Sequence, residues 1–259
     1  AKQLVENGSK EVILLGQNVN AYNYKNRKLS DLLYALDKIK ELKRIRYTTS
    51  HPKDVTNDLI EAHSSCKKLM PLLHLPVQSG STKILKRMNR DHTIEEYLEK
   101  IDCLKQKNPS IKFSSDFIIA YPGETEDDFQ KTVSLMEKIK FINSYSFIFS
   151  PRPGTPASKL NLVNVDVSKK RLNIFQIMAD AIKKDYKKEL INSTAKVLFE
   201  NKTKNENIYF GRDEYFNSVI VKSSKNLIGK IRKIKINECN QNTLFGESII
   251  DNNSKEFAA

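Results

Sequence analysis

Residues 72–82 read LLHLPVQSGST and join a buried strand to a polar end. The first letters, LLHL, are those of a strand packed inside a protein, whereas the last, QSGST, are small and polar. Pro76 lies between the two parts and cannot donate a hydrogen bond to a neighbouring strand, so we expect a bulge or irregular pairing there. Such a strand is typical of a parallel sheet, whose ligands bind beyond the carboxyl ends of the strands.

The same order of apolar strand, polar end and helix recurs along residues 1–158. The other predicted strands are EVILLGQN (11–18), RIRYTTSHP (44–52), FSSDFIIAYPGET (113–125) and INSYSFIFSPRPGTPA (142–157). Apolar residues at helical spacing predict helices between these strands. Strands that alternate with helices predict an α/β fold with a parallel sheet, as either a barrel or an open doubly wound sheet.

Hydrogen-bonding residues mark where the helices are expected to begin. Ser30 is the candidate N-cap of the helix after the first strand, and Thr56 begins the helix after the second. Thr93 and Glu96 have the spacing of a capping box. Thr125 precedes acidic residues, which favour the first turn of a helix.

The polar ends GQN, SHP, QSGS, YPGET and SPRPGTP would converge on one rim of the sheet. Each of them fits an ordinary connecting loop, because turns need Gly and Pro. Five such ends with amide, hydroxyl, imidazole, carboxylate and guanidinium groups favour a binding site instead. The candidate residues are Gln17, Asn18, Ser50, His51, Gln78, Ser79, Asp116 and Arg152.

The composition is that of a folded, basic protein of 259 residues, with 39% hydrophobic residues and a net charge of +13. A positive surface attracts polyanions such as nucleic acids, although a compositional bias toward Lys would raise the charge equally. No apolar run reaches the roughly 18 residues that a membrane span needs, and no signal peptide opens the chain. We therefore expect a cytoplasmic protein without a membrane partner.

The three cysteines, Cys66, Cys103 and Cys239, lie far apart in the sequence. They share no CxxC spacing, so they fit reduced intracellular thiols better than a local metal site. We expect no metal ion to be bound by this chain alone.

The pattern changes toward the C-terminus. Residues 165–192 place apolar positions at helical spacing opposite a Lys-rich face, which predicts a connecting helix. From residue 195 onward the period becomes two, and five short strands predict a small antiparallel β-barrel of the OB type. Barrels of this type bind oligonucleotides by stacking bases on aromatic rings beside cations, although alternate aromatics also fill the barrel core. The aromatic residues in question are Tyr209, Phe210, Tyr215 and Phe216, and Arg212 lies among them.

Five motifs carry a resemblance when they are taken in order: LLGQNVNAY, TTSHP, LHLPVQSGS with KRMNRDHT, SSDFIIAYPGET, and YSFIFSPRPGTPA. Together they resemble the methylthiotransferase family of radical S-adenosylmethionine enzymes. The terminal barrel is similar to the TRAM domain with which that family grips tRNA. The resemblance implies a partial radical-SAM βα barrel over 1–160 without its first strand and cluster loop, a connecting helix over 161–192, a TRAM-like RNA-binding barrel over 193–252 and a tail over 253–259.

The resemblance implies the addition of a methylthio group to N6-isopentenyladenosine next to the anticodon, with the tRNA anticodon stem-loop as partner. The implied cofactors are S-adenosylmethionine and, in the full-length family, 4Fe–4S clusters. The expected cofactor-binding residues are Gln17, Asn18, Ser50, Gln78, Ser79 and Asp116. The expected substrate-binding residues are His51, Arg87, Arg90, Arg152, Tyr209, Phe210 and Arg212. His51 equally fits a turn held by its neighbours, and Arg87, Arg90 and His92 equally fit a solvated face.

The sequence departs from the family in its cysteines. The family carries its catalytic cluster on a CxxxCxxC motif just upstream of the GQN strand, and three more cysteines in an N-terminal domain. Because such clusters need thiolate ligands, we expect this chain alone not to generate the radical. It is then either the C-terminal portion of the enzyme or a cluster-free module that binds tRNA or S-adenosylmethionine.

Two further alternatives stay open at this point. Residues 11–18 would form an exposed apolar edge strand, which favours pairing with a chain that supplies the missing N-terminal part. Sister enzymes of the family modify threonylcarbamoyladenosine or a ribosomal protein, so the substrate depends on the branch.

Overall fold

The computed structural model describes residues 1–249, which fall into two compact units. The first unit comprises residues 1–183, and the second begins at Lys184. The finer division into 1–160, 161–192 and 193–252 stays a prediction. The expected tail over 253–259 lies outside the described residues, as do residues 250–252 of the expected barrel.

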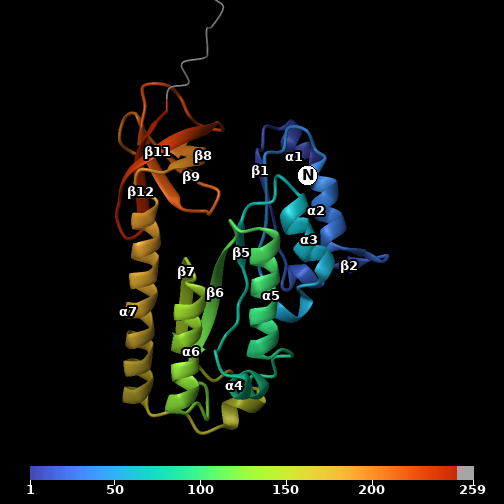
Figure 1. Ribbon diagram of the computed structural model, residues 1–259, viewed down its shortest axis with the longest axis vertical. Helices are drawn as coiled ribbons and strands as arrows, with labels where there is room; N and C mark the ends of the chain where they lie inside the picture. Colours follow the sequence, from blue (N-terminus) through green and yellow to red (C-terminus); the bar gives the residue numbers. More distant parts are fainter. Residues whose placement is uncertain (250–259) are drawn as a thin grey trace, which may run out of the picture. The chain divides into compact units, whose positions relative to one another are not determined.

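Five parallel strands form the framework of the first unit (Figure 1). They are β1 (Glu11–Leu14), β4 (Arg44–Tyr47), β5 (Leu72–His74), β6 (Lys112–Ile119) and β7 (Asn143–Ile148). Strand β1 pairs with β4, and β6 lies between β5 and β7. A bridge between Ile45 and Leu69 joins β4 to the segment just before β5. The expected order of parallel strands is therefore confirmed, although the ladder is interrupted between β4 and β5.

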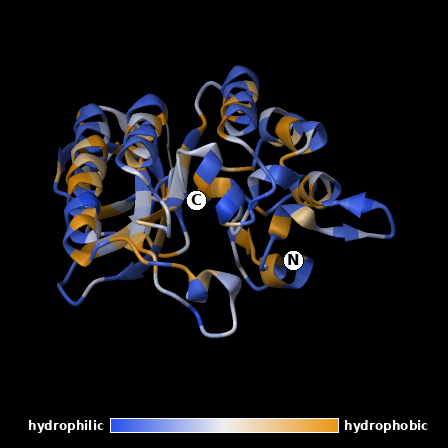
Figure 2. Cartoon of the chain, turned by 90° about the horizontal axis from the view of Figure 1, so that it is seen from below, coloured by the Kyte–Doolittle hydropathy of each residue, from blue (hydrophilic) through white to orange (hydrophobic). Residues whose placement is uncertain are grey.

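Helices pack on one face of this row of strands. The helices of the first unit are α1 (Lys2–Glu6), α2 (Leu29–Asp37), α3 (Asn57–Ser65), α4 (Thr82–Arg87), α5 (Ile94–Lys107) and α6 (Glu126–Ile139). Figure 2 shows that the longer helices have an apolar and a polar side, as amphipathic helices on a core do. Leu73, Leu75 and Phe117 on the helix-facing side of the strands are buried. On the opposite face, Tyr145 and Phe147 of β7 are exposed, and we call this part the open face.

A short hairpin and three 3₁₀ turns were not foreseen from the sequence pattern. A small hairpin pairs β2 (Asn23–Tyr24) with β3 (Arg27–Lys28). The 3₁₀ turns η1 (Val19–Ala21) and η2 (Pro52–Asp54) follow β1 and β4, and η3 (Pro156–Lys159) follows β7. These turns shape the loops at the polar rim, where short connections control the positions of side chains.

Most of the predicted helix starts are confirmed. Thr93 and Glu96 form the capping box of α5, and Thr125 forms another with Asp128 at the start of α6. The prediction that Ser30 is an N-cap is wrong, because Ser30 lies inside α2, which begins at Leu29. The Ser30 hydroxyl donates to Asp58 of α3, so a tertiary contact uses the group that the sequence suggested as a cap.

The irregularity expected at Pro76 is confirmed. Strand β5 ends at His74, and the missing ladder bonds are replaced by the buried Ser115 hydroxyl of β6. This hydroxyl donates to the Leu75 carbonyl at 3.1 Å and accepts from the Val77 N–H at 2.9 Å. Pairing with β6 then resumes at Gln78, whose φ of 74° turns the chain away from the sheet.

We expect Ser115→Ala to lower the free energy of unfolding by about 1–3 kcal/mol, because it leaves the buried Val77 N–H without a partner, whereas the Leu75 carbonyl keeps its bond from the Tyr97 hydroxyl. Ser146→Ala on β7 is the matched control and should change stability by less than about 0.5 kcal/mol. Urea unfolding of the two variants measures the difference. Equal stabilities would contradict the bridging role of Ser115.

Helix α7 (Val165–Glu189) begins in the first unit and belongs to its core there. Phe175 is fully buried, and its ring centroid lies 4.7 Å from that of Phe117 on β6. Leu172, Met178 and Ile182 pack against the same core. The predicted helix therefore exists, and most of its length stabilises the first unit through apolar burial.

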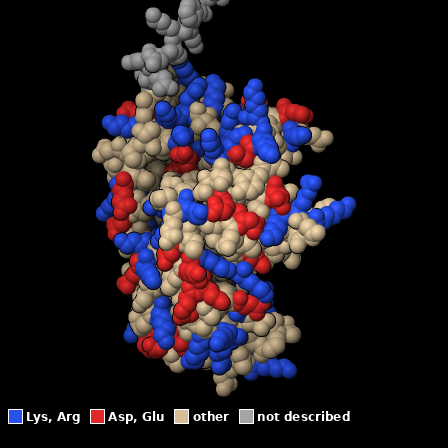
Figure 3. Space-filling view, turned by 45° about the vertical axis from the view of Figure 1, so that its right-hand side comes forward, with Lys and Arg blue, Asp and Glu red and all other residues tan. Residues whose placement is uncertain are grey.

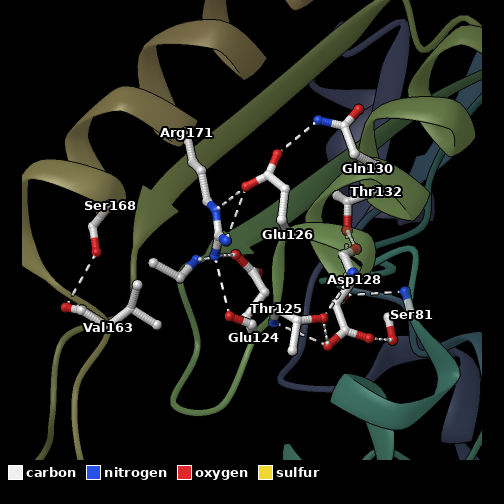
Figure 4. A network of polar contacts seen from close by, with 12 residues as sticks. Ser81, Glu124, Thr125, Glu126, Asp128, Gln130, Thr132, Val163, Ser168 and Arg171 are labelled. Atoms are coloured by element: carbon white, nitrogen blue, oxygen red, sulfur yellow. Dashed lines mark hydrogen bonds and ion pairs between the residues drawn. The ribbon is translucent and has the colours of Figure 1, made fainter.

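Figure 4 shows a polar network that fixes the start of α7 to the loop after β6. Arg171 donates to the carboxylates of Glu124 and Glu126, both at 3.0 Å. Burial raises the pKa of Glu124 to about 7, and the Ala120 N–H and Arg171 partly offset that rise. The second carboxylate oxygen of Glu124 has no hydrogen-bond partner among residues 1–249. Arg171 is thus the principal counter-charge of a buried carboxylate.

Replacing Arg171 by Met should cost about 3–5 kcal/mol of stability, because a buried carboxylate loses its partner. Lys169→Met on an exposed position of the same helix is the control and should cost less than about 0.5 kcal/mol. Thermal and urea unfolding would measure both changes. A loss for Arg171→Met no larger than that of the control would refute this account of the network.

The second unit contains the closed β-barrel that was expected. Its strands are β8 (Thr194–Lys202), β9 (Ile208–Arg212), β10 (Ser218–Lys222), β11 (Ile231–Cys239) and β12 (Thr243–Ser248). They close in the order β10-β12-β11-β8-β9. The expectation of a purely antiparallel barrel needs one correction, because β10 and β12 pair in parallel. Gly246 permits close pairing, since a Cβ there would lie 2.2 Å from the Lys235 carbonyl oxygen.

Candidate functional site

The open face of the first unit carries side chains from three neighbouring strands. The register places Asp116 of β6 beside Tyr145 of β7, and Ile118 beside Phe147. Tyr145 is 57% exposed and Phe147 is 62% exposed, although both belong to a regular strand. Because side chains alternate along a strand, these residues share a face with Asp116 and lie opposite the helices.

A carboxylate, an imidazole and a phenol ring meet on this face. The Asp116 carboxylate lies 3.5 Å from Nε2 of His74 on β5. The His74 ring makes an edge contact with Tyr145 at a centroid distance of 6.5 Å. Asp116 was predicted as a site residue, whereas His74, Tyr145 and Phe147 were not. The period-two pattern SYSFIF contained a signal for the two aromatics, but such rings usually fill a core.

The loops after β1 and β4 are held together by two asparagines. Asn20 accepts from the His51 N–H and donates to the His51 carbonyl, both at 2.8 Å. Asn18 donates to Asp54 at 2.7 Å. Gln17 is exposed at the same loop. The structure therefore brings Asn18 and His51 to one part of the rim, and Asn20 is a positioning residue that sequence reasoning missed.

His51 and His92 form a ring pair at the rim, with centroids 5.4 Å apart. Burial lowers the pKa of both rings, and the nearby charge of Arg90 lowers them further. The pKa of His92 falls to about 4, so this ring is neutral at pH 7. Burial also lowers the pKa of the half-buried Arg90, and the charge of Asp116 opposes that effect. Arg90, His51, His92 and Asp116 thus share one electrostatic environment.

The end of the β5 loop has a structural role that the sequence did not reveal. Ser79 is fully buried, and its hydroxyl lies 3.4 Å from that of Thr132 on α6. A Cβ at Gly80 would lie 2.4 Å from the Lys131 carbonyl oxygen, so only glycine permits this approach to α6. Gln78 is buried at the turn. Ser79 points into the packing against α6, and we leave it out of the proposed site.

Two of the predicted arginines differ in their surroundings. Arg87 donates through Nε to the Pro122 carbonyl at 3.0 Å and so supports the loop after β6. Arg152 is exposed on the loop after β7, where its backbone carbonyl accepts from Thr155. Arg87 therefore has a structural contact, whereas the guanidinium of Arg152 extends into solvent.

The barrel of the second unit divides the predicted aromatics between core and surface. Tyr209 is 5% exposed and belongs to the barrel core, as the alternative interpretation of the sequence held. The Arg212 guanidinium lies 4.2 Å from the Phe216 ring centroid and 5.3 Å from that of Phe210. Both rings are half-buried. This arrangement keeps a cation between two aromatic side chains on the outer surface.

The cysteines do not fit an iron–sulfur cluster. Cys66 is buried, and burial raises the pKa of its thiol to about 11, which disfavours the thiolate that a cluster needs. Cys66 and Cys103 lie in the first unit, and Cys239 lies in the second. Among residues 1–249, no three His, Cys, Asp or Glu side chains converge as a metal ion requires.

Comparison with known families identifies the class of protein. A model described as "Radical SAM superfamily" matches residues 1–136, which is more than half of the chain, and a TRAM domain model matches residues 188–249. The chain belongs to the radical SAM superfamily. The resemblance drawn from the five motifs and the barrel is therefore confirmed at this level. Within residues 1–249, no helix is long and apolar enough to cross a membrane.

Two curated relatives carry the name tRNA-2-methylthio-N(6)-dimethylallyladenosine synthase. The protein of Pelagibacter ubique (strain HTCC1062) is 56% identical over 264 residues, which cover 100% of this chain and 58% of the relative. The protein of Ruegeria sp. (strain TM1040) is 44% identical, and the match covers 96% of this chain and 58% of the relative. This chain therefore spans less than two thirds of the length of these relatives.

Solved structures give weaker likenesses. The radical S-adenosylmethionine methyltransferase TsrM from Kitasatospora setae aligns with a TM-score of 0.48 at 12% identity, over 61% of this chain and 31% of TsrM. Elp3 from Methanocaldococcus infernus aligns with a TM-score of 0.45 at 11% identity, over 89% of this chain and 76% of Elp3.

Acid should destabilise the first unit through its two buried neutral histidines. Burial lowers the pKa of His63 and of His92 to about 4, below the value of about 6.5 in an unfolded chain. Between these values the unfolded chain binds more protons, so the free energy of unfolding falls as the pH drops from 6.5 toward 4. His92→Phe keeps an aromatic ring and should reduce the loss between pH 7 and pH 5 by about 2 kcal/mol. Urea unfolding at several pH values measures the slope, and an unchanged slope would contradict the neutral state of His92.

Proposed function

We propose that this chain is the barrel and RNA-binding portion of a tRNA methylthiotransferase that acts on N6-isopentenyladenosine with S-adenosylmethionine as cofactor. The observation that carries the proposal is the 56% identity to the Pelagibacter relative over 100% of this chain. The polar rim of the first unit and the TRAM domain match support it. A tRNA-modifying role also assigns the protein to the cytoplasm.

The rim residues can hold the adenosyl and amino-acid groups of the cofactor. Asp116 is half-buried and faces the open side of the sheet, so its carboxylate can accept from ribose hydroxyls or an amino group. Asn18 and Gln78 offer amides on neighbouring loops. The exposed Tyr145 and Phe147 give a flat apolar surface on which an adenine ring can stack. Gln17 and Ser50 complete the proposed cofactor-binding set.

S-adenosylmethionine, when bound, would supply the radical chemistry of the reaction, and the proposed cofactor-binding residues of the rim would hold it. This chain's residues orient the adenosyl group and the target base and keep water from the space between them. The cluster needs a segment with thiolates, in the same chain or in a partner, because Cys66, Cys103 and Cys239 do not provide the site. His51 and Arg152 are proposed to contact the tRNA near the target nucleoside.

The second unit is proposed to grip the anticodon stem-loop through the surface of its barrel. Phe210 and Phe216 can stack with bases, and Arg212 between them can contact a phosphate. Arg232, Lys233 and Lys235 are exposed along β11. Figure 3 shows basic and acidic side chains interspersed on the face in view, without one continuous basic patch there. Diffuse charge gives attraction to RNA, and the aromatic rings then have to fix its position.

A second candidate is a module that binds tRNA or S-adenosylmethionine without catalysis. The observation in its favour is the cysteine content, since the three thiols do not fit a cluster. Mass spectrometry of tRNA from cells without the gene decides between the two functions. Loss of the methylthio group from isopentenyladenosine supports the methylthiotransferase, whereas unchanged tRNA supports the binding module. Loss of a methylthio group from threonylcarbamoyladenosine would instead indicate the sister substrate.

Phe210→Ala should weaken binding of an anticodon stem-loop RNA by about 5- to 100-fold, because one base loses its stacking partner. Phe245→Ala, at a half-buried aromatic on β12, is the matched control and should bind within about twofold of the unmodified protein. Fluorescence anisotropy at several salt concentrations would measure both affinities and the salt slope. Equal weakening by both variants would indicate a damaged barrel and would contradict a specific role for Phe210.

A further inference from the structure

The hairpin of β2 and β3 projects from the first unit, as Figures 1 and 2 show. Every residue over 21–28 is exposed, whereas the next two, Leu29 and Ser30, are buried. The hairpin itself therefore adds nothing to the hydrophobic core, and packing does not account for the side chains at its tip.

The turn at the tip gives the hairpin a defined shape. Lys25 and Asn26 are its two central residues, with φ values of 50° and 61°. Two positive φ values are those of a type I′ turn, whose twist matches that of the paired strands. Tyr24 lies directly opposite Arg27 in the register, so their side chains project from the same face. The tip thus presents a phenol ring next to a guanidinium.

The base of the hairpin is fixed to the first unit. The Lys28 N–H donates to the Asp31 carboxylate of α2 at 2.8 Å, and the Lys28 ammonium pairs with Asp58 of α3 at 3.2 Å. Leu29 follows directly and is 2% exposed. A two-stranded hairpin is marginally stable by itself, so these contacts hold it in place while the tip stays accessible to a partner.

The tip combines an exposed aromatic ring with cations that have no acidic neighbour in the sequence. Tyr24 is 58% exposed, and the Lys25 ammonium lies 5.4 Å from its ring centroid. Residues 12–30 contain three cations and no Asp or Glu. Lys28 has its carboxylate partner, whereas no carboxylate of residues 1–249 pairs with Lys25 or Arg27. The positive charge of the tip is therefore uncompensated.

The hairpin continues from the rim loop after β1. Asn20 holds that loop to His51 through two hydrogen bonds of 2.8 Å. Tyr24 comes six residues after Asn18, so even a fully extended chain would separate the two by at most about 22 Å. A nucleic acid with one base at the rim therefore has its neighbouring nucleotides within reach of the hairpin.

We propose that the hairpin of β2 and β3 is an RNA-binding element of the first unit, separate from the barrel of the second. The Tyr24 ring stacks on an unpaired base, and Lys25 and Arg27 contact the phosphates beside it. Aromatic rings next to cations bind single-stranded RNA in this way, with little dependence on the identity of the base. The identity of the RNA as the loop of a substrate tRNA rests on the proposed function.

The composition of the tip favours RNA over an anionic membrane surface. The sequence AYNYKNRK over 21–28 carries two tyrosines and no Leu, Ile, Val, Phe or Trp. Elements that lie on membranes bury an apolar face at the boundary between headgroups and acyl chains, and this hairpin offers little aliphatic area for that purpose. A stacking ring between two cations matches bases and phosphates instead.

Binding of an anticodon stem-loop RNA to the full chain, followed by fluorescence anisotropy, tests this assignment. Tyr24→Ala should weaken binding about fivefold or more, because one base loses its stacking partner. Arg27→Gln should weaken binding and lower the salt slope by about one unit, as the loss of one phosphate contact does. Tyr34→Ala and Lys40→Gln, at exposed positions of α2 and of the loop after it, are the matched controls and should bind as the unmodified chain does. Hairpin variants that bind like these controls would overturn the proposal.

A photo-crosslink locates the contact. Benzoylphenylalanine in place of Tyr24 should crosslink to nucleotides of the loop, and the same group in place of Tyr34 should not. Equal crosslinking from both positions, or none from position 24, would contradict the assignment. Vesicles of anionic phospholipid represent the competing partner. If Arg27→Gln releases the chain from such vesicles and leaves RNA binding unchanged, the hairpin is a membrane contact and the proposal is wrong.

A single-stranded oligouridine separates this inference from the proposed function. If Tyr24→Ala weakens oligouridine binding while the unmodified chain binds the stem-loop no better than oligouridine, the hairpin assignment stands and the proposed function is contradicted. If the unmodified chain prefers the stem-loop and the hairpin variants bind it unchanged, the proposed function stands and the inference is overturned.

Discussion

The parallel pairing of β6 with β5 and β7 is the constraint on which the rest of the first unit depends. One face of β6 is buried under the helices through Phe113 and Phe117. The alternation of side chains then forces Asp116 onto the open face, beside Tyr145. Pro76 would break this pairing, and the Ser115 hydroxyl restores it by bridging the gap. Backbone hydrogen bonds on both sides of the proline, with the Ser115 hydroxyl between them, therefore keep the two strands in register and Asp116 on the open face.

Helix α7 connects the packing of the core with the loop that follows the site strand. Phe175 buries its ring against Phe117, and Arg171 neutralises Glu124 just after β6. Apolar burial and a buried ion pair thus act on the same strand from one helix. The helix that precedes the barrel therefore has a structural role within the first unit, in addition to continuing toward the second.

The local signals in the sequence were sufficient for the element order and for several helix starts. Thr93 and Thr125 became caps because the groups they need lie three residues away in the same segment. Ser30 and Ser79 carried equally plausible local signals and were used elsewhere, by Asp58 and Thr132 on distant helices. A small hydroxyl side chain satisfies whichever partner the tertiary structure brings close, and a linear pattern does not contain that information.

The sequence by itself determined the alternation of strands and helices, the barrel at the C-terminal end and the position of Asp116 and His51 near strand ends. These features follow from hydrophobic period and chain order, which are properties of neighbouring residues. Only the tertiary structure decided that Tyr209 fills a core while Phe210 flanks Arg212, and that the buried ring nitrogens of His92 have no hydrogen-bond partner among residues 1–249. The burial of a side chain and its hydrogen-bond partners depend on segments far apart in the chain. They are therefore decided only when those segments pack together.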